Sequence, residues 1–339
     1  KANILSGVRY GSTLGSPVSL LLYNKDWPNW THKMSVEPVK DPVEKLQMPR
    51  PGHADFAGMV KYRQDDLRNI LERSSARETT MRVAAGAAAR QLLAQFDIRI
   101  FSHVTRIGAA ASDNSLVDHP LEPGTDEWTA FFKRAEESDV SCTDEKAADA
   151  MHAAIDQAKA KGYSLGGLVE CIACGVPAGL GSHVHWDRKL DAMLAYSMMS
   201  INAIKMVEIG LGGRVSQTPG SQVHDELFYS RESGYSRSHN HAGGIEGGMS
   251  NGEPIVVRLA MKPLPTMTAP LRSVNVKNKS AKEAHYERAD VCAVPAAAVV
   301  GEAMLALTLA DALMDKIGGD SVIEMTERFN ALPHVPLEW

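Results

Sequence analysis

The chain has 339 residues and a formal net charge of −5 at pH 7. This length is enough for one large domain or two ordinary ones, and a mildly acidic chain has no overall attraction for nucleic acid. Four cysteines are too few for a disulfide framework, so we expect a reducing, cytoplasmic location. We expect no membrane partner either, because no apolar run approaches the ~20 residues of a membrane span.

The predicted elements alternate between strands and long helices. Strands are expected where short apolar runs lie between glycine, proline and polar residues, and helices where apolar residues recur every three or four positions. In chain order we predict strands at 4–10 and 17–23, helices at 65–72 and 76–96, a strand at 98–107, a helix at 146–161, a strand within 164–181, a helix at 190–204, strands at 205–210 and 254–261, and a helix from Pro295 to 317. Residues 31–49 and 113–141 are expected to be surface segments, the second a polar peripheral insert.

This order of elements is not the strict strand–helix–strand alternation of a doubly wound sheet. It favours an α+β fold with layered helices and antiparallel strands. The sequence contains no linker between independent domains, so residues 1–339 are predicted to form a single domain.

A tight turn at Arg50-Pro-Gly-His53 is the first candidate for a functional site. Proline fixes one backbone angle and glycine permits the left-handed region, so the turn can hold a guanidinium and an imidazole side by side. Further along, Ser75 and Glu78 have the spacing of a helix-capping box, which places Arg77 in the first turn of the following helix. A cation there opposes the helix dipole, and a bound anion would remove the conflict. Arg50, His53 and Arg77 together predict an anion site.

Three other motifs keep two interpretations open. Cys171 and Cys174 match Cys-x-x-Cys but lie in an apolar strand without a second pair, which favours core cysteines over a metal site. His183 and His185 would share one side of a strand as a metal pair, or they belong to a hydrogen-bonded loop. The His239-Asn-His run precedes many glycines, which either let a ligand approach the backbone or form tight turns. No metal site is predicted.

Polar residues also flank two predicted apolar segments. Lys262 and Thr266 leave a strand across two prolines, as a rigid polar exit or a simple surface loop. Arg288 and Asp290 precede the last long helix. Asp290 is either a solvated turn residue or a carboxylate held for proton transfer, and Arg288 would then be another anion ligand.

Together these stretches resemble the chorismate synthase family. Seven runs match its characteristic motifs in the family's order and span nearly all of residues 3–325. They lie at residues 5–17, 50–55, 73–79, 179–187, 243–252, 261–263 and 290–296.

The resemblance implies a carbon–oxygen lyase of the shikimate pathway and of aromatic amino acid biosynthesis. In that reaction 5-enolpyruvylshikimate 3-phosphate loses phosphate by a 1,4-anti elimination to give chorismate. Reduced FMN is required although no net oxidation occurs. The substrate carries two carboxylates and a phosphate, so several arginines are expected around it. Bifunctional members reduce their own flavin, which makes NADPH a further implied reactant.

The resemblance also implies roles for individual residues. His53 and Asp290 match catalytic positions, the second beside flavin N5, and Arg50, Arg77 and Arg288 match substrate-binding arginines. The positions implied around FMN are Arg73, Ser74, Ser75, Ala76, Asn202, Ala203, Gly248, Met261, Lys262, Thr266 and Arg288. The implied fold is a β-α-β sandwich with antiparallel sheets and internal helices, assembled as a homotetramer with FMN near subunit contacts.

The chain departs from the family pattern at its start and at a few positions. The family has an upstream segment with a second catalytic histidine and an arginine-rich stretch, whereas this chain begins at Lys1. That start suggests a removed leader, such as a plastid one, or a missing block. The alternative function is therefore a non-catalytic, FMN-binding remnant of the family. Ala289 replaces a frequent polar residue, His241 replaces a usual arginine, and Arg63 and Met206 each replace a usual glycine.

Overall fold

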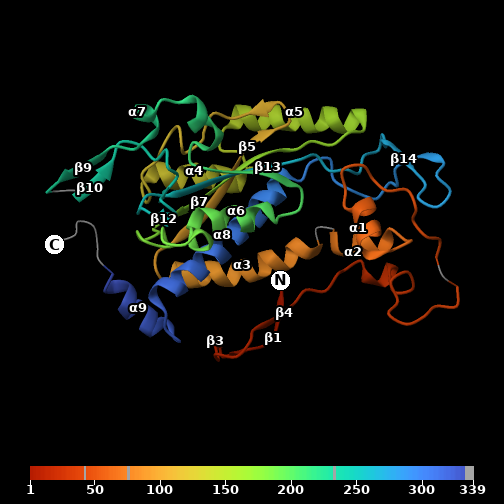
Figure 1. Cartoon of the computed structure of the whole chain (residues 1–339), viewed down its shortest axis with the longest axis horizontal. Coiled ribbons are helices and arrows are strands. Elements are labelled where there is room, and N and C mark those ends of the chain that lie inside the picture. Colours follow the sequence, from red (N-terminus) through yellow and green to blue (C-terminus); the bar gives the residue numbers. More distant parts are fainter. Residues whose placement is uncertain (42, 75–76, 232–233, 333–339) are drawn as a thin grey trace. The chain divides into compact units, whose positions relative to one another are not determined.

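The computed structural model describes residues 1–41, 43–74, 77–231 and 234–332. The chain divides into two compact units. Unit 1 comprises Lys1–Ala84 with Pro265–Arg288, and unit 2 comprises Ala85–Leu264 with Ala289–Trp339. Figure 1 shows the elements of both. The single domain over 1–339 stays a prediction.

A five-stranded antiparallel sheet forms the centre of unit 2. Its strand order is β6-β5-β7-β13-β8. Apolar and β-branched residues dominate its long strands, as expected for strands covered by helices. The bounds are β5 Arg99–Ile107, β6 Ala110–Ala111, β7 Gly167–Cys174, β8 Ile204–Ile209 and β13 Ile255–Met261.

Helices cover both faces of this sheet because successive side chains of a strand point to opposite faces. On one face Cys171 of β7 lies under Gly301 of α8 (Val294–Ile317), where an added Cβ would come within 2.6 Å of the sulfur. On the other face Ile172 and Cys174 pack against α4 (Asp126–Glu137). The two cysteines are therefore buried on opposite faces, and the prediction of core cysteines is confirmed.

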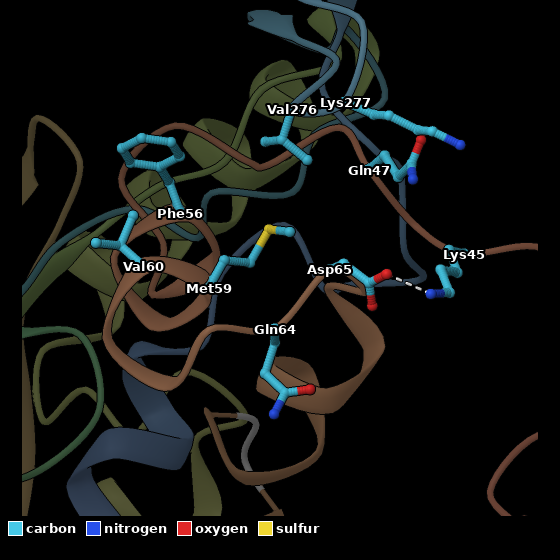
Figure 2. A pocket seen from close by; sticks show the side chains of 9 residues that line it. All are labelled: Lys45, Gln47, Phe56, Met59, Val60, Gln64, Asp65, Val276 and Lys277. Atoms are coloured by element: carbon cyan, nitrogen blue, oxygen red, sulfur yellow. Dashed lines mark hydrogen bonds and ion pairs between the residues drawn. The ribbon is translucent and has the colours of Figure 1, made fainter.

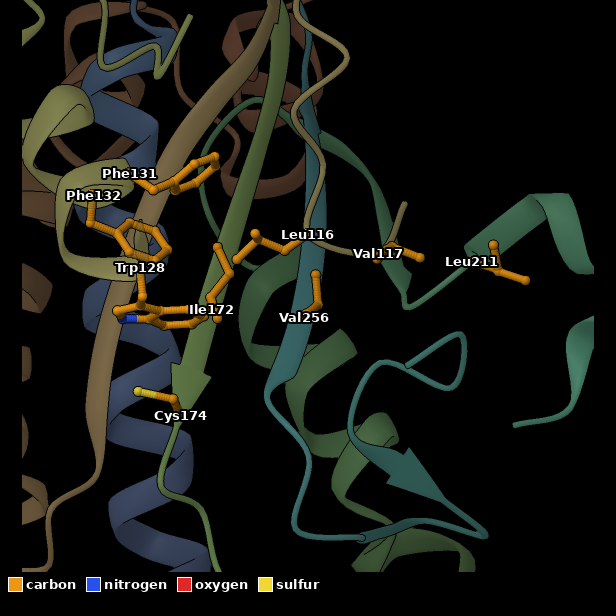
Figure 3. Packing of buried hydrophobic residues seen from close by; sticks show 9 residues of the cluster. All are labelled: Leu116, Val117, Trp128, Phe131, Phe132, Ile172, Cys174, Leu211 and Val256. Carbon is orange, nitrogen blue, oxygen red and sulfur yellow. The ribbon is translucent and has the colours of Figure 1, made fainter. Parts of the chain in front are cut away.

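The α4 helix corrects the prediction of a polar peripheral insert at 113–141. Its side chains Trp128, Phe131 and Phe132 are buried and join Ile172 in one apolar cluster (Figure 3). The segment looks polar because charged residues cover the outer face of an amphipathic helix. Phe131 and Phe132 lie three and four positions after Trp128, which is the spacing of one helix face in an otherwise polar segment.

A buried carboxylate holds the segment before α4 against the sheet. Glu170 of β7 accepts hydrogen bonds from His103 Nε2 (3.1 Å), Ser115 Oγ (2.7 Å) and the Leu116 backbone N–H (2.8 Å). Burial raises the pKa of Glu170, but these hydrogen bonds outweigh burial and the pKa lies below its usual value. The ionised carboxylate thereby fixes the start of the 113–141 segment.

The α8 helix overturns the expectation that no apolar run is long enough for a membrane span. By length and composition it could cross a membrane, yet most of its apolar stretch is buried inside unit 2. It contacts β5, β7 and α6 (Leu190–Met199), which makes it a core helix. Its Ala303 lies against Gly86 of α3 (Arg77–Ala94), within unit 2.

The remaining elements of unit 2 are short or peripheral. The helices are α5 Glu145–Lys161, α7 Gly220–Val223 and α9 Val322–Asn330, with 3-10 turns η2 Trp186–Arg188 and η3 Gly212–Gln217. Two hairpins complete it, β9 Leu227–Ser230 with β10 Gly234–Arg237, and β11 Ile245–Glu246 with β12 Met249–Ser250.

Unit 1 consists of small hairpins and short helices. Its strands pair as β1 with β4, β2 with β3 and β14 with β15, all antiparallel. Their bounds are β1 Asn3–Ser6, β2 Val8–Arg9, β3 Ser12–Thr13, β4 Ser19–Leu21, β14 Arg272–Val274 and β15 Ala281–Glu283, with the turn η1 Trp27–Asn29 and the helices α1 Asp55–Tyr62 and α2 Arg68–Ser74. With antiparallel sheets throughout and helices between them, the predicted α+β class is confirmed.

The close approach of α3 and α8 at Gly86 gives a test of the packing. A Cβ there would come within 2.5 Å of Ala303 Cβ. We expect Gly86→Leu to lower the free energy of unfolding by about 1–3 kcal/mol through overpacking, although leucine favours a helix more than glycine does. Urea denaturation measures the change. The control is Ala87→Leu, at the exposed neighbouring position, which should change stability by less than about 0.5 kcal/mol.

Candidate active site

A buried cluster in unit 1 is built around the guanidinium of Arg50. The Arg50 side chain donates to both oxygens of Asp55, from Nε (3.0 Å) and Nη2 (3.2 Å), and its Nη1 donates to Thr266 Oγ1 (2.8 Å). The His53 ring lies against the same guanidinium, with Nδ1 3.1 Å from Nη2. Arg50, Asp55 and Thr266 are all buried, whereas His53 is partly open. The histidine is thus the member that a ligand can reach.

Local sequence explains this geometry. Gly52 has a positive φ of 75°, and the His53 backbone N–H donates to Arg50 O (3.3 Å), as predicted for a tight turn. Asp55 is the first residue of α1, where a carboxylate is favoured by the helix dipole. It also accepts the Arg50 backbone N–H (3.0 Å). One carboxylate therefore holds the start of the turn, the guanidinium and the helix N-terminus together.

Asp55 also hydrogen-bonds to His53 through Oδ1 and the ring nitrogen Nδ1. Burial opposes ionisation of Asp55, but the hydrogen bonds from His53 and Arg50 outweigh it and hold the pKa of the carboxyl well below its usual range. An ionised Asp55 favours the histidine tautomer with its proton on Nδ1, so the lone pair is on Nε2, which lies 3.3 Å from Arg50 Nη2. Asp55 was missed as a site residue, although it ends the Arg-Pro-Gly-His-Ala-Asp run.

A second group of unit 1 brings two of the predicted substrate arginines together. Arg77 and Arg288 both lie close enough to Asp26 to help lower the pKa of its carboxyl, after the larger effects of hydrogen bonds from Asn29 and Trp30. The Arg77 guanidinium lies 5.8 Å from the centre of the Trp30 ring and also bonds to Glu72 Oε2 (2.6 Å). Each arginine thus contributes positive charge near this exposed carboxylate, and Arg77 also has its own ion pair with Glu72.

Two predicted cofactor positions of unit 1 lie at the end of α2. Arg73 is exposed, and the Ser74 hydroxyl donates to Ile70 O one turn earlier (2.8 Å). Thr266 is a third predicted cofactor position. Its hydroxyl oxygen accepts a hydrogen bond from Arg50, so its hydroxyl hydrogen can still be donated to a ligand. Ser75 and Ala76, and with them the capping box predicted at Ser75, lie outside the described residues.

In unit 2 four predicted positions meet where β13 ends and β8 begins. Met261 is paired with Ile204, and the Lys262 backbone N–H donates to Ala203 O (2.9 Å). Ala203, next to Asn202, has a positive φ of 68°. A non-glycine residue in this region costs of order 1–3 kcal/mol, so the surrounding contacts impose the conformation. The structure therefore brings Asn202, Ala203, Met261 and Lys262 together.

Asp290 borders the same end of the sheet. Its neighbour Val291 accepts a hydrogen bond from Leu165 N (2.8 Å). The next residue, Gly166, is so close to Met261 that a Cβ would meet the Met261 carbonyl oxygen at 2.2 Å. The Asp290 side chain itself is exposed.

Gly248 lies elsewhere in unit 2. Its carbonyl accepts from Leu190 N (2.8 Å), at the start of α6, whereas Asn202 follows the end of that helix. A ten-residue helix is about 15 Å long. Within one chain, Gly248 is therefore not beside the other four positions. His183 and His185 are both exposed in the loop that precedes η2.

A pocket of about 460 Å³ lies beside α1 in unit 1 (Figure 2). Phe56, Met59 and Val60 form its apolar wall, and the ion pair of Lys45 with Asp65 lies at one side. No predicted site residue lines it. The candidate active site is therefore the polar cluster and not this pocket.

The depressed pKa of Asp55 predicts how stability depends on pH. The unfolded chain binds a proton at Asp55 below about pH 4, whereas the folded chain does not until a lower pH, so this stabilisation is lost as the pH falls below about 4. Above that pH, Asp55→Asn should cost roughly 3–5 kcal/mol, because Arg50 keeps a buried charge without its partner.

Urea unfolding of both proteins between pH 7 and about pH 3 measures this dependence. The difference in unfolding free energy between the unchanged protein and Asp55→Asn should narrow toward the acid end. A difference that stays constant over this range would contradict the assignment. Asp65→Asn, at an exposed ion pair, is the control and should cost no more than about 1 kcal/mol.

Comparison with known proteins shows the family to which the chain belongs. A family model described as chorismate synthase matches residues 1–314. The chain is 54% identical to the chorismate synthase of Brevibacillus brevis over 330 residues, covering 96% of this chain and 83% of that protein. It is 51% identical to that of Aquifex aeolicus, covering 97% and 82%. A crystal structure of a chorismate synthase matches with a TM-score of 0.77 and 43% identity, over 97% of this chain and 83% of the other. The chain belongs to the chorismate synthase family.

Proposed function

We propose that this protein catalyses the 1,4-anti elimination of phosphate from 5-enolpyruvylshikimate 3-phosphate, with reduced FMN bound, to give chorismate. The observation that carries the proposal is the Arg50–His53–Asp55 cluster, in a chain about half identical to proteins named chorismate synthase. That cluster combines a fixed cation, an accessible proton carrier and a buried anion that orients both.

The residues present fit FMN by their donor chemistry. FMN has a phosphate dianion and ring carbonyls, which need cations and neutral donors. Arg73 and Arg288 in unit 1 and Lys262 in unit 2 are cations at predicted positions, and Ser74, Thr266 and Asn202 supply hydroxyl or amide groups. The strained backbone at Ala203 supports a binding role for that turn. When bound in its reduced state, FMN would supply electron density that helps phosphate leave.

Arginines of unit 1 supply the charge that the substrate needs. The positive charges of Arg77 and Arg288 both help to lower the pKa of the Asp26 carboxyl. A substrate carboxylate or phosphate would be attracted by the same two charges. Most donors of Arg50 are already used by Asp55, Thr266 and Nε2 of His53. We therefore assign Arg50 chiefly to positioning His53 and assign anion binding chiefly to Arg77 and Arg288.

His53 and Asp290 divide the proton transfers. Asp55 accepts the Nδ1 proton of His53, and when the ring is also protonated on Nε2, that second proton passes to the departing phosphate oxygen and leaves the neutral ring. Asp290, exposed beside the end of the sheet, can move a proton at the cofactor. Both assignments rest on side chains that a ligand can reach, since His53 is partly exposed and Asp290 is exposed.

The oligomer, the location and the reductant belong to the same proposal. We propose a cytoplasmic homotetramer, with NADPH as the reductant if the protein reduces its own flavin. The alternative is a remnant that binds FMN without turnover. Identities near 50% to proteins named chorismate synthase favour the enzyme over this alternative.

The decisive experiment measures phosphate release from 5-enolpyruvylshikimate 3-phosphate under anaerobic conditions, with FMN reduced by dithionite. Chorismate and phosphate should form in equal amounts, and neither should form with oxidised FMN. Bound FMN without any phosphate release would establish the remnant instead.

Substitution of the two proton carriers gives a first test of the assignments. We expect His53→Ala to lower kcat by roughly 10²–10⁴-fold and Asp290→Asn by at least tenfold, because each removes a group that moves a proton. Circular dichroism and FMN affinity should stay unchanged. His183→Ala, at an exposed histidine, is the control and should keep the full rate. Full rates in both active-site variants would refute these roles.

Arg77 tests the anion site separately. Arg77→Ala should weaken substrate binding by about 1.5–3 kcal/mol, roughly 10–150-fold, as expected for a charged hydrogen bond. Arg77→Lys keeps the charge but loses the fork of donors, so an intermediate loss is expected. Titration calorimetry measures both values. The control is Arg99→Ala, at an exposed arginine of unit 2, and an equal loss in this variant would remove the specific role of Arg77.

A further inference from the structure

Three potential metal ligands meet at the base of the β9–β10 hairpin in unit 2. Asp225 precedes β9, and His239 and His241 follow β10. One carboxylate oxygen and one nitrogen from each histidine all lie within 4.8 Å of one another. None of these residues belongs to the predicted active site, and His241 stands where the family usually has arginine.

The Asp225 carboxylate is fixed and buried. Its side chain has no exposed surface, and its two oxygens accept the backbone N–H groups of His241 and Ala242, both at 3.0 Å. These bonds leave lone pairs on both oxygens, because each carboxylate oxygen can accept two hydrogen bonds. Asp225 is therefore a pre-oriented anion that can still bind a cation.

The backbone around His241 is also fixed. The His241 carbonyl accepts from Leu211 N (2.9 Å), and Asn240 bridges Pro254 O (2.8 Å) and Gly244 N (2.7 Å) with its side-chain amide. The backbone at His241 is thus held before any ligand binds. Little conformational entropy would be lost on binding, which favours affinity.

The imidazole of His241 has its Nδ1 close to both Asp225 and Gln222, 4.0 Å from Asp225 Oδ1. Its Nδ1 lies 3.0 Å from the carbonyl oxygen of Gln222. A proton on Nδ1 donated to that carbonyl puts the lone pair on Nε2, and such a hydrogen bond from the second nitrogen typically fixes a ligating imidazole. The partner ring of His239 is stacked on it, with centroids 4.6 Å apart and planes at 15°.

We propose that Asp225, His239 and His241 bind one divalent transition-metal ion of the zinc class. Two imidazoles and one carboxylate suit Zn²⁺, Ni²⁺ or Cu²⁺, whereas Mg²⁺ and Ca²⁺ prefer sites made wholly of oxygen. Ligand atoms around tetrahedral zinc are about 3.4 Å apart, given bonds of about 2.1 Å. The ligand atoms must therefore come closer together by up to about 1.4 Å. The exposed His239 side chain can make that movement.

Such an ion would clamp the hairpin at its base. The hairpin closes with two hydrogen bonds between Glu226 and Ser238, each 3.0 Å, and the three ligands lie just beyond them. The side chains of β9 are all exposed, so few contacts other than its pairing with β10 hold this strand. A metal ion bound across the base would cross-link the two ends of the hairpin, where side-chain packing is missing.

Titration calorimetry with the tag-free, chelator-treated full chain tests the site, using ZnCl₂ and NiCl₂ alone. We expect one ion per chain. His239→Gln should weaken binding at least about tenfold, and the double variant His239→Gln/His241→Gln should bind no ion up to about 1 mM. The matched control is His183→Gln/His185→Gln, a second exposed histidine pair, which should leave affinity and stoichiometry unchanged.

Hydrogen exchange of the hairpin supplies an independent readout. Zn²⁺ should slow exchange of the β9 and β10 amides at least about threefold in the native chain and in the His183/His185 variant, but not in the His239/His241 variant. No binding to the native chain at about 1 mM Zn²⁺, or binding that survives in the His239/His241 double variant, would overturn the proposal.

Discussion

The buried ion pair of Arg50 with Asp55 is the interaction on which the candidate active site depends. A buried guanidinium is costly unless a carboxylate and further acceptors satisfy it, and here Asp55 and Thr266 do so. The same carboxylate begins α1 and holds His53. One side chain therefore couples the stability of this part of unit 1 to the orientation of its proposed catalytic histidine, and the two properties cannot be varied independently through Asp55.

Unit 2 relies on a comparable arrangement at Glu170. This buried carboxylate lies on the central strand β7 and holds the chain that leads into α4. The aromatic side chains of α4 then complete the apolar cover of one face of the sheet. In both units an ionised carboxylate with several donors fixes an irregular segment that hydrophobic packing alone would leave loosely placed.

The sequence predicts the regular parts of this fold well. Helix α8 and strands β5 and β13 are long and strongly patterned, so their predicted and observed bounds nearly coincide, whereas β7 occupies only the middle of the predicted run 164–181. Helix α1 was missed because it is short and follows a turn, and α4 was missed because charged residues mask its aromatic stripe. Local patterns reveal periodicity, but they do not reveal which polar segments fold back on a core.

The candidate site can be predicted from the sequence only in part. The turn at Arg50 and His53 follows from proline and glycine, whereas the contact of Arg50 with Thr266 joins residues 216 positions apart and follows from no local rule. The resemblance to the family indicates most of the proposed FMN positions, but not which of them lie close together in space. It could not indicate that Gly248 and Asn202 lie at opposite ends of α6, or that Asp225 lies beside the histidines after β10.

The burial of the cysteines has a practical consequence for spectroscopy. Cys142, Cys171 and Cys174 are enclosed, and only Cys292 among the four is partly accessible. Burial raises the pKa of the Cys292 thiol, so its alkylation should be slow at neutral pH and faster in mildly alkaline solution. Because Cys292 lies two residues after Asp290, a fluorophore attached there would report on the proposed proton carrier without removal of any other thiol.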